Sequence, residues 1–252
     1  MAKDNTLFTY LLRLADDHLI LSQRLGEWTG RAPTLEEDLA LTNIALDLIG
    51  QARSLYSYAG AIEGRGRDED QLAFTRPERD YLNALIVEQP NGDFAHTIVR
   101  QFFIAAFMVP FWREMENSGD AQLAAIAAKA SKEVAYHLRH TSEWVVRLGD
   151  GTDESHRRMV EALEDLAMYT GELFVNDAVT DAAVADGFGV NVSSLEKEWR
   201  QTVDQVLGEA TLELPDVSHM QSGGRDGLHT EHLGHILSEL QYMQRAYPGL
   251  TW

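Results

Sequence analysis

Apolar residues recur every third or fourth position along this chain, and few turn signals interrupt them. The first such stretch shows the pattern in Leu7, Tyr10, Leu11, Leu14, Leu21 and Leu25. This spacing matches one face of an α-helix. Short runs such as VNDAV and VNV resemble strands, but no hairpin turn pairs them with a neighbouring run. The pattern therefore predicts an all-α protein.

Turn and capping signals divide the chain into a few long helices. We expect helices over about 7–25, 35–55, 94–115, 120–148, 152–174 and 230–247. Thr34 and Glu37 form a capping-box pattern, and a shorter helix is expected to begin at Thr75, with Pro77 in its first turn. The segments 60–70 and 175–192 are expected to be loops, with another helix after Ser193. Long helices joined by short turns pack antiparallel, which predicts one helical-bundle domain over 1–252.

The chain is strongly acidic. It has 252 residues, of which 44% are hydrophobic, and a formal net charge of −19. An acidic surface repels phosphate backbones and anionic lipid, so we expect neither nucleic acid nor a membrane as a partner. A basic protein partner would suit this surface.

The cysteine content and the hydropathy of the chain indicate the cellular compartment in which we expect the protein. The chain has no cysteine, which excludes disulfides, thiolate metal sites and thiol nucleophiles. Arg13, Asp16 and Asp17 interrupt the region that a signal peptide would need to keep apolar. The run FFIAAFMVPFW (102–112) is shorter than the ~18 apolar residues of a membrane span. We expect a soluble, cytoplasmic protein.

One motif raises the question of a metal centre. The stretch KASKEVAYHLRH (129–140) places Glu133 four residues before His137, so both lie on one helix face. Di-iron helical bundles build their sites from a Glu-x-x-His pair on each of two helices and a Glu from each of two others. On the second helix, TNIALDLIGQAR (42–53) offers Asp47 at a comparable place.

The ligand set for two metals is incomplete. Gly50 and Gln51 follow Asp47 where a histidine would be needed, and Tyr136 follows Glu133. The helix over 94–115 carries no acid before Trp112. We therefore expect no catalytic, cofactor-binding or metal-binding residue here, with Asp47, Glu133 and His137 as degenerate-site candidates only. A mononuclear site from these three side chains is the alternative, and a hydrogen-bonded Glu133–His137 pair is the simpler interpretation.

The remaining motifs are weak. His229, His232 and His235 lie three residues apart near the start of the last helix, a spacing that zinc sites also use. A surface or packing role is the simpler interpretation, because no ligand from another segment is evident. The chain contains no G-x-S-x-G, Walker A or G-x-G-x-x-G sequence.

Long phrases of the sequence resemble a known family. These are SQRLGEWTGRAP, DLALTNIALDLIGQARSLYSYAG, LAFTRPERDYLNALIVEQPNGDFAHTIVRQFF, KEVAYHLRH, RLGDGTDES and GLHTEHLGHILSELQYMQRAYPGLTW. Together they run from about residue 5 to 252 and resemble the C subunits of phenylacetyl-CoA epoxidase, in the PaaA/PaaC family. The resemblance implies a ferritin-like antiparallel helical bundle with additional C-terminal helices.

The resemblance also implies a role. In that family the di-iron centre and the acyl-CoA site belong to a homologous A subunit, and the C subunit serves as its structural scaffold. A separate reductase supplies electrons from NADPH, and O₂ with phenylacetyl-CoA gives a ring epoxide. We transfer no catalytic residue to this chain. We expect it to be inactive alone and to form homo- and hetero-oligomers with the A subunit and other epoxidase components in aerobic phenylacetate degradation.

Two other functions stay open at the level of sequence. One is a free-standing metal-dependent oxidase or oxygenase that uses Asp47, Glu133 and His137. The other is a helical binding or storage module without redox chemistry. If the chain is a subunit, its tryptophans are candidate interface anchors, because tryptophan is frequent at binding hot spots. The candidates are Trp28, Trp112, Trp144 and Trp252.

Overall fold

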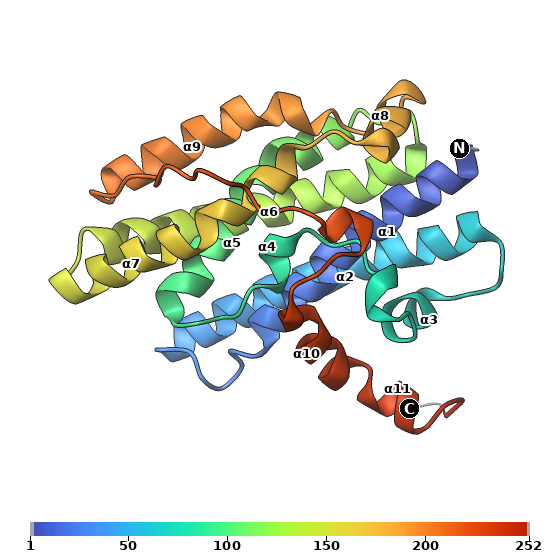
Figure 1. Cartoon of the computed structure of the whole chain (residues 1–252), viewed down its shortest axis with the longest axis horizontal. Helices are drawn as coiled ribbons and strands as arrows, with labels where there is room; N and C mark the ends of the chain where they lie inside the picture. The colour runs from blue at the N-terminus through green and yellow to red at the C-terminus, as the bar shows by residue number, and fades with distance from the viewer. Residues whose placement is uncertain (1–2, 251–252) are drawn as a thin grey trace. The chain divides into compact units, whose positions relative to one another are not determined.

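The computed structural model describes residues 3–250, and within them every regular element is helical (Figure 1). The α-helices are α1 (Lys3–Gly26), α2 (Leu35–Glu63), α3 (Glu69–Phe74), α4 (Leu85–Glu88), α5 (Phe94–Met115), α6 (Ala121–Gly149), α7 (Asp153–Leu166), α8 (Ala178–Ala185), α9 (Glu196–Glu209), α10 (Glu231–Leu240) and α11 (Tyr242–Ala246). The prediction of an all-α protein is confirmed.

The chain forms two compact units. Unit 1 comprises residues 1–90 and 223–252, and unit 2 comprises residues 91–222. Unit 1 is therefore discontinuous in sequence, because its last helices follow all of unit 2. Each unit is built around one long helical hairpin, α1–α2 in unit 1 and α5–α6 in unit 2. The prediction of a single domain over 1–252 stays a prediction.

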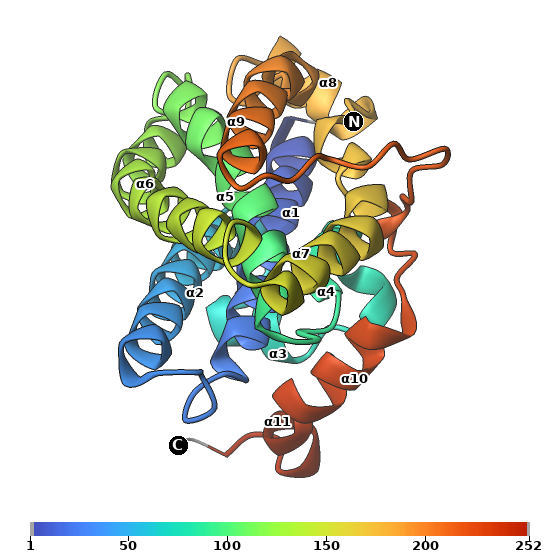
Figure 2. The same ribbon diagram turned by 90° about the vertical axis from the view of Figure 1, so that its left-hand side faces the viewer.

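The α1–α2 hairpin forms the core of unit 1. The two helices pack along their length, and a short loop between them reverses the chain (Figure 2). The Thr34 side chain accepts a hydrogen bond from the Glu37 backbone nitrogen, as its capping pattern predicts. α2 runs eight residues beyond the expected Leu55 and ends at Glu63. Gly64 caps it, and its φ of 67° is the left-handed conformation that glycine adopts readily.

The expectation for residues 60–88 is partly wrong. The loop is shorter than expected, because Asp68 and Gln71 form a capping box that begins α3 at Glu69. Thr75 ends this helix instead of beginning one. The following residues make a short 3₁₀ turn, Glu78–Asp80, and then α4. Pro77 disfavours a helical conformation at the residue before it, which explains why the helix does not continue.

The C-terminal helices complete unit 1. The single helix expected over 230–247 is divided into α10 and α11 at Gln241. The side chain of Gln241 is buried, and its amide donates hydrogen bonds to the Arg76 carbonyl (3.0 Å) and the Tyr81 hydroxyl (2.8 Å). α10 packs against α1 and α4. The C-terminal segment is thus fixed to the N-terminal part of the chain.

The α5–α6 hairpin forms the core of unit 2. Asp93 caps α5 and Asp120 caps α6, each by accepting hydrogen bonds from backbone nitrogens of the first turn. α5 is long and apolar enough to cross a membrane by length and composition, but 83% of its most apolar window is buried inside the protein. Burial of this kind is typical of the core helix of a soluble protein.

The shorter helices of unit 2 cover this hairpin. α7 and α9 pack against both α5 and α6. Trp199 of α9 is buried, and its indole nitrogen donates a hydrogen bond to the Phe103 carbonyl at 2.9 Å. The expectation of a loop over 175–192 is partly wrong, because Asp177 caps the short helix α8, while residues 186–191 are turn and irregular. The expected helix over 152–174 ends at Leu166 and continues as 3₁₀ turns.

Candidate functional site

The three degenerate-site candidates lie in different units. Asp47 is on α2 in unit 1, whereas Glu133 and His137 are on α6 in unit 2. His137 is fully buried, and its backbone carbonyl accepts a hydrogen bond from Thr141 at 2.8 Å. Glu133 forms an ion pair with Lys129 at 3.4 Å, one helical turn away. The carboxylate of Glu133 thus has a cation of its own helix beside it.

The positions that break the di-iron pattern have structural surroundings of their own. Gly50 lines a pocket in unit 1. The ring of Tyr136 packs near the rings of His137 and His140, and the Arg139 guanidinium lies over it. Within residues 3–250, no group of three or more His, Asp or Glu side chains is placed to hold a metal ion. The absence of metal from this chain stays a prediction that metal analysis can test.

Two of the three C-terminal histidines, His229 and His235, have different surroundings. Nδ1 of His229 lies 2.9 Å from the Glu88 carboxylate, and its Nε2 lies 2.8 Å from the Tyr81 carbonyl. His235 is exposed and lines a different, polar pocket of about 580 Å³ with Arg24 and Glu239. For His229 the geometry favours a packing role over zinc ligation.

Three buried carboxylates in unit 1 form the most developed polar arrangement of this unit. Asp16 and Asp17 lie on α1 and Glu88 at the end of α4, and all three are almost fully buried. The sequence does contain a signal for the first two, because adjacent acids inside an apolar helical stripe require partners when they are buried.

Asp16 is neutralised by Arg76. One guanidinium nitrogen of Arg76 lies 3.1 Å from an Asp16 oxygen and a second nitrogen contacts the other oxygen. The Tyr56 hydroxyl and the Leu82 backbone nitrogen also donate to this carboxylate. Burial lowers the pKa of Arg76, but the Asp16 carboxylate outweighs burial and raises it, so the guanidinium stays charged.

The rings beside this pair enclose the guanidinium. Arg76 lies 4.2 Å from the centroid of the Tyr81 ring and 5.6 Å from that of Tyr56. Burial raises the pKa of Tyr81 to about 12, although Arg76 opposes this shift. Tyr81 is therefore a neutral phenol, and it donates its proton to the Ala73 carbonyl. These contacts fix the segment 73–82 against α1.

Asp17 and Glu88 bind the C-terminal segment in a similar way. Arg225 donates to Asp17 at 2.7 and 3.1 Å, and the Ala84 nitrogen donates at 2.7 Å. Burial raises the pKa of Asp17, and Arg225 opposes this shift. The backbone nitrogen and hydroxyl of Thr230 both donate to one Glu88 oxygen at 2.7 Å. Asn83 donates to the other Glu88 oxygen at 2.9 Å.

The arrangement of these three carboxylates suits a structural role. Every carboxylate oxygen of Asp16, Asp17 and Glu88 accepts at least one hydrogen bond from the chain itself. Arginine is a permanent cation that replaces a metal ion as the neutralising charge. The acids of α1 therefore do not fit a role as iron ligands.

A pocket of about 460 Å³ opens in unit 1 beside this network. Leu19 of α1, Ile49 and Arg53 of α2, and Asp70 and Phe74 of α3 line it. Its wall is mostly apolar, although Arg53, Glu69 and Asp70 also line it, which suits a bulky side chain better than a polar small molecule. Sequence reasoning did not find this pocket, because it depends on the unexpected position of α3.

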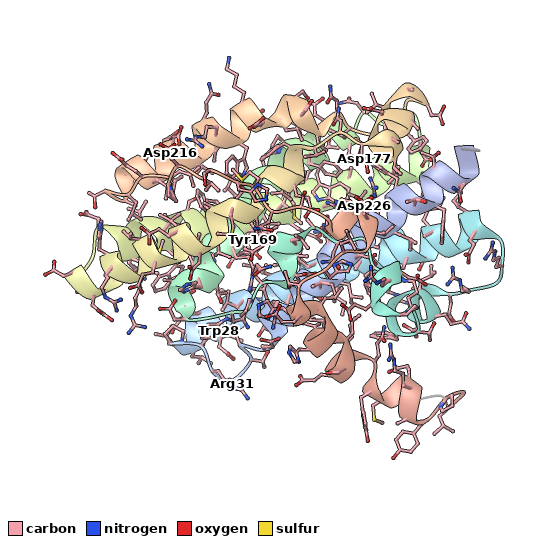
Figure 3. All side chains as sticks on the ribbon, viewed as in Figure 1. Trp28, Arg31, Tyr169, Asp177, Asp216 and Asp226 are labelled. Carbon is pink, nitrogen blue, oxygen red and sulfur yellow. The ribbon has the colours of Figure 1, made fainter. Side chains whose placement is uncertain are left out.

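The candidate tryptophan anchors divide by exposure. Trp112 is fully buried in unit 2 and serves as a core residue. Trp144 is half-buried and packs edge-on against Phe94 at 5.0 Å. Trp28 is also half-buried and lies with Arg31 in the loop between α1 and α2, as Figure 3 shows. Trp252 lies outside the described residues.

Comparison with known proteins identifies the family. The model of the family described as phenylacetic acid catabolic protein matches residues 1–252. A relative from Escherichia coli (strain K12), named as the C subunit of 1,2-phenylacetyl-CoA epoxidase, is 52% identical over 248 residues. That match covers 98% of this chain and the full length of the relative. The all-helical fold agrees with the ferritin-like architecture expected from the resemblance, and the chain belongs to the phenylacetic acid catabolic protein family.

Proposed function

We propose that this chain is the non-catalytic structural C subunit of a multicomponent oxygenase that epoxidises phenylacetyl-CoA in aerobic phenylacetate degradation. The observation that carries the proposal is its 52% identity, over nearly the whole chain, with a protein named as the C subunit of such an epoxidase. The chain acts by holding a homologous di-iron A subunit in its working geometry. Reducing equivalents and O₂ are used in that partner and not here.

The side chains support a scaffolding role. Asp16 and Asp17 are held by Arg76 and Arg225, and Gly50 has no side chain to offer. A scaffold must keep its shape while a partner binds, and buried, fully hydrogen-bonded charges restrict a chain to one packing arrangement. Such a protein works in the cytoplasm together with its partners. The lack of cysteine is compatible with this reducing compartment, where disulfides are rare.

The experiment is a comparison of the chain alone with the chain co-expressed with the A subunit. We expect the two proteins to co-purify in a fixed ratio, with iron and phenylacetyl-CoA-dependent O₂ consumption only in preparations that contain the A subunit. Elemental analysis and an oxygen electrode measure both quantities. Close to two irons per chain, with turnover by the isolated chain, would refute the proposal.

The alternative of a free-standing oxidase makes a different prediction. If Asp47, Glu133 and His137 bound a catalytic metal, the Glu133→Ala variant would lose both metal and turnover while staying folded. On the scaffold proposal this variant changes neither quantity, because Glu133 is a partly buried residue of α6 whose carboxylate is paired with Lys129. A storage module would instead show no association with the A subunit and would assemble into a large shell.

A further inference from the structure

The outward face of α2 is apolar. Leu35, Leu39 and Leu46 are 71%, 55% and 60% exposed, and Ile49 is exposed as well. Their steps of three, four and seven residues place them on one side of the helix. From Leu35 to Ile49 this row of side chains spans about 21 Å at 1.5 Å per residue. The buried side of α2 is apolar as well, and a contiguous row of exposed aliphatic side chains marks an interaction surface.

Another helix of this chain shows what a solvated face looks like. α6 has the same length as α2, 29 residues each. Its exposed positions include Lys132, Arg139 and Arg147 together with small alanines. The corresponding face of α2 carries large aliphatic side chains in place of charges. The difference is therefore a property of α2 and not of long helices in this protein.

The pocket described above adjoins this row. Ile49 belongs to both, and Gly50 and Arg53 continue from α2 into the pocket wall. A row of exposed leucines that ends at a pocket of about 460 Å³ has the form of a binding face with a hole for one large side chain. We call Leu35, Leu39, Leu46, Ile49 and this pocket the α2 face.

The charges around the α2 face are acidic at both ends. Glu36, Glu37 and Asp38 form the first turn of α2. Asp68, Glu69 and Asp70 lie at the start of α3 beside the pocket. The cations near them are paired with acids: Arg53 with Glu69 at 3.1 Å, and Arg67 with Glu63. A second copy of this chain would bring the same acids and another net charge of −19 against them. Charge therefore opposes a second copy and favours a partner with basic ends.

We propose that the α2 face is where this chain binds a different subunit of the epoxidase, one that presents an apolar helix surface with basic side chains at both ends. This inference rests on the proposed function, and it assigns the docking to one helix and one pocket. Burial of the row supplies affinity, and the acidic ends fix the register and speed the encounter.

The test compares two glutamates on matched helices. Leu46→Glu places a charge in the centre of the α2 face, and Ala135→Glu places the same charge at an exposed position of α6 between Lys132 and Arg139. Glutamate is a good helix former, so both variants keep their helices. With the purified A subunit, we expect the Kd of Leu46→Glu to rise at least about tenfold, because a buried unpaired charge is costly. The Kd of Ala135→Glu should equal that of the unmodified chain.

A second pair of variants tests the charge argument. Glu36→Lys reverses one acid at the end of the α2 face, and Glu143→Lys reverses an exposed acid of α6. We expect Glu36→Lys to slow association several-fold at low salt, with the difference fading at high salt. Glu143→Lys should leave the rate unchanged. Circular dichroism melting curves of all four variants identify any loss of folding.

Each outcome decides between the two proposals. Equal binding by Leu46→Glu and the unmodified chain would overturn the assignment of the α2 face and leave the scaffold function standing. Failure of the unmodified chain to bind the A subunit would overturn both. If the isolated chain dimerises and Leu46→Glu makes it monomeric, the occupant is a second copy, and the proposal of a basic partner is wrong.

Discussion

At the scale of single residues, the buried acids of unit 1 join segments that lie far apart in the sequence. Each acid accepts hydrogen bonds from a residue in a distant part of the sequence. One carboxylate therefore fixes the position of the whole segment that carries its donor. Asp16 is bound by Arg76, and Asp17 by Arg225. Losing one partner of such a pair is costly, because the remaining charge is left buried without compensation.

Arg76 provides a direct test of this cost. We expect Arg76→Met to lower the free energy of unfolding by roughly 3–5 kcal/mol, since the buried Asp16 then loses the guanidinium that neutralises it. Arg53→Met removes an exposed ion pair with Glu69 and should cost less than about 1 kcal/mol. Urea denaturation followed by circular dichroism measures both. Similar losses in the two variants would show that burial of the Asp16–Arg76 pair is not decisive.

His229 gives unit 1 a pH dependence of known sign. Burial lowers the pKa of His229, but hydrogen bonds to the Glu88 carboxylate and the Tyr81 carbonyl outweigh burial and raise it. A raised pKa in the folded state means that protonated His229 stabilises the fold. This stabilisation is complete below the ordinary histidine pKa of about 6.5 and is lost as the pH rises through the higher folded value.

The corresponding measurement is thermal unfolding of His229→Gln between pH 6 and pH 9. We expect the difference in Tm from the unmodified chain to be largest at pH 6 and to shrink as the pH rises. His235→Gln, on the exposed side of α10, is the control and should show a small difference at every pH. A His229→Gln difference that grows toward pH 9 would contradict the assigned sign.

At the scale of elements, the long helices were predictable and the short ones were not. α5 and α6 begin and end within one residue of their expected bounds, because Asp93 and Asp120 are clear caps and the apolar period is long. α3 was missed because Thr75 and Pro77 looked like a start signal, while Asp68 and Gln71 supplied the cap that operates. The division at Gln241 depends on tertiary hydrogen bonds that no local pattern reveals.

The candidate site also has features that the sequence predicts and features that it does not. The gap in the metal pattern at Gly50 and Tyr136 was visible in the sequence, since ligand spacing along a helix is a local property. The partners of Asp16, Asp17 and Glu88 were not, because Arg76, Arg225 and Thr230 come from other segments. Sequence predicts which side chains need a partner, and only the fold shows which partner they have.

The turn that brings Arg225 to Asp17 depends on the absence of a side chain. A Cβ atom at Gly224 would lie 2.1 Å from the Asn83 carbonyl oxygen. We expect Gly224→Ala to destabilise unit 1 by about 1–3 kcal/mol, because backbone has to move to relieve the clash. Gly208→Ala in α9 meets nothing within 4 Å and should be neutral or slightly stabilising. Chemical denaturation compares the two, and equal effects would contradict the packing at Gly224.

At the scale of the whole molecule, the chain has the fold of its family. The acids of α1, Asp16 and Asp17, form ion pairs with arginines and have a structural role. The family match and the identity with the C subunit of an epoxidase confirm the resemblance read from the sequence. The co-expression experiment with the A subunit belongs to this scale, because it asks where in the assembly the iron and the turnover reside. The variants of the α2 face then ask which surface of the assembly depends on this chain.

The sequence order of unit 1 has a consequence for how the protein is made. Residues 17 and 225 are 208 positions apart, with all of unit 2 between them. At a synthesis rate of about 5–20 residues per second, the arginine leaves the ribosome roughly 10–40 s after the acid it neutralises. Until then, Asp17 lacks Arg225, and water has to solvate its carboxylate. Asp17 therefore obtains its neutralising partner only after all of unit 2 has been synthesised.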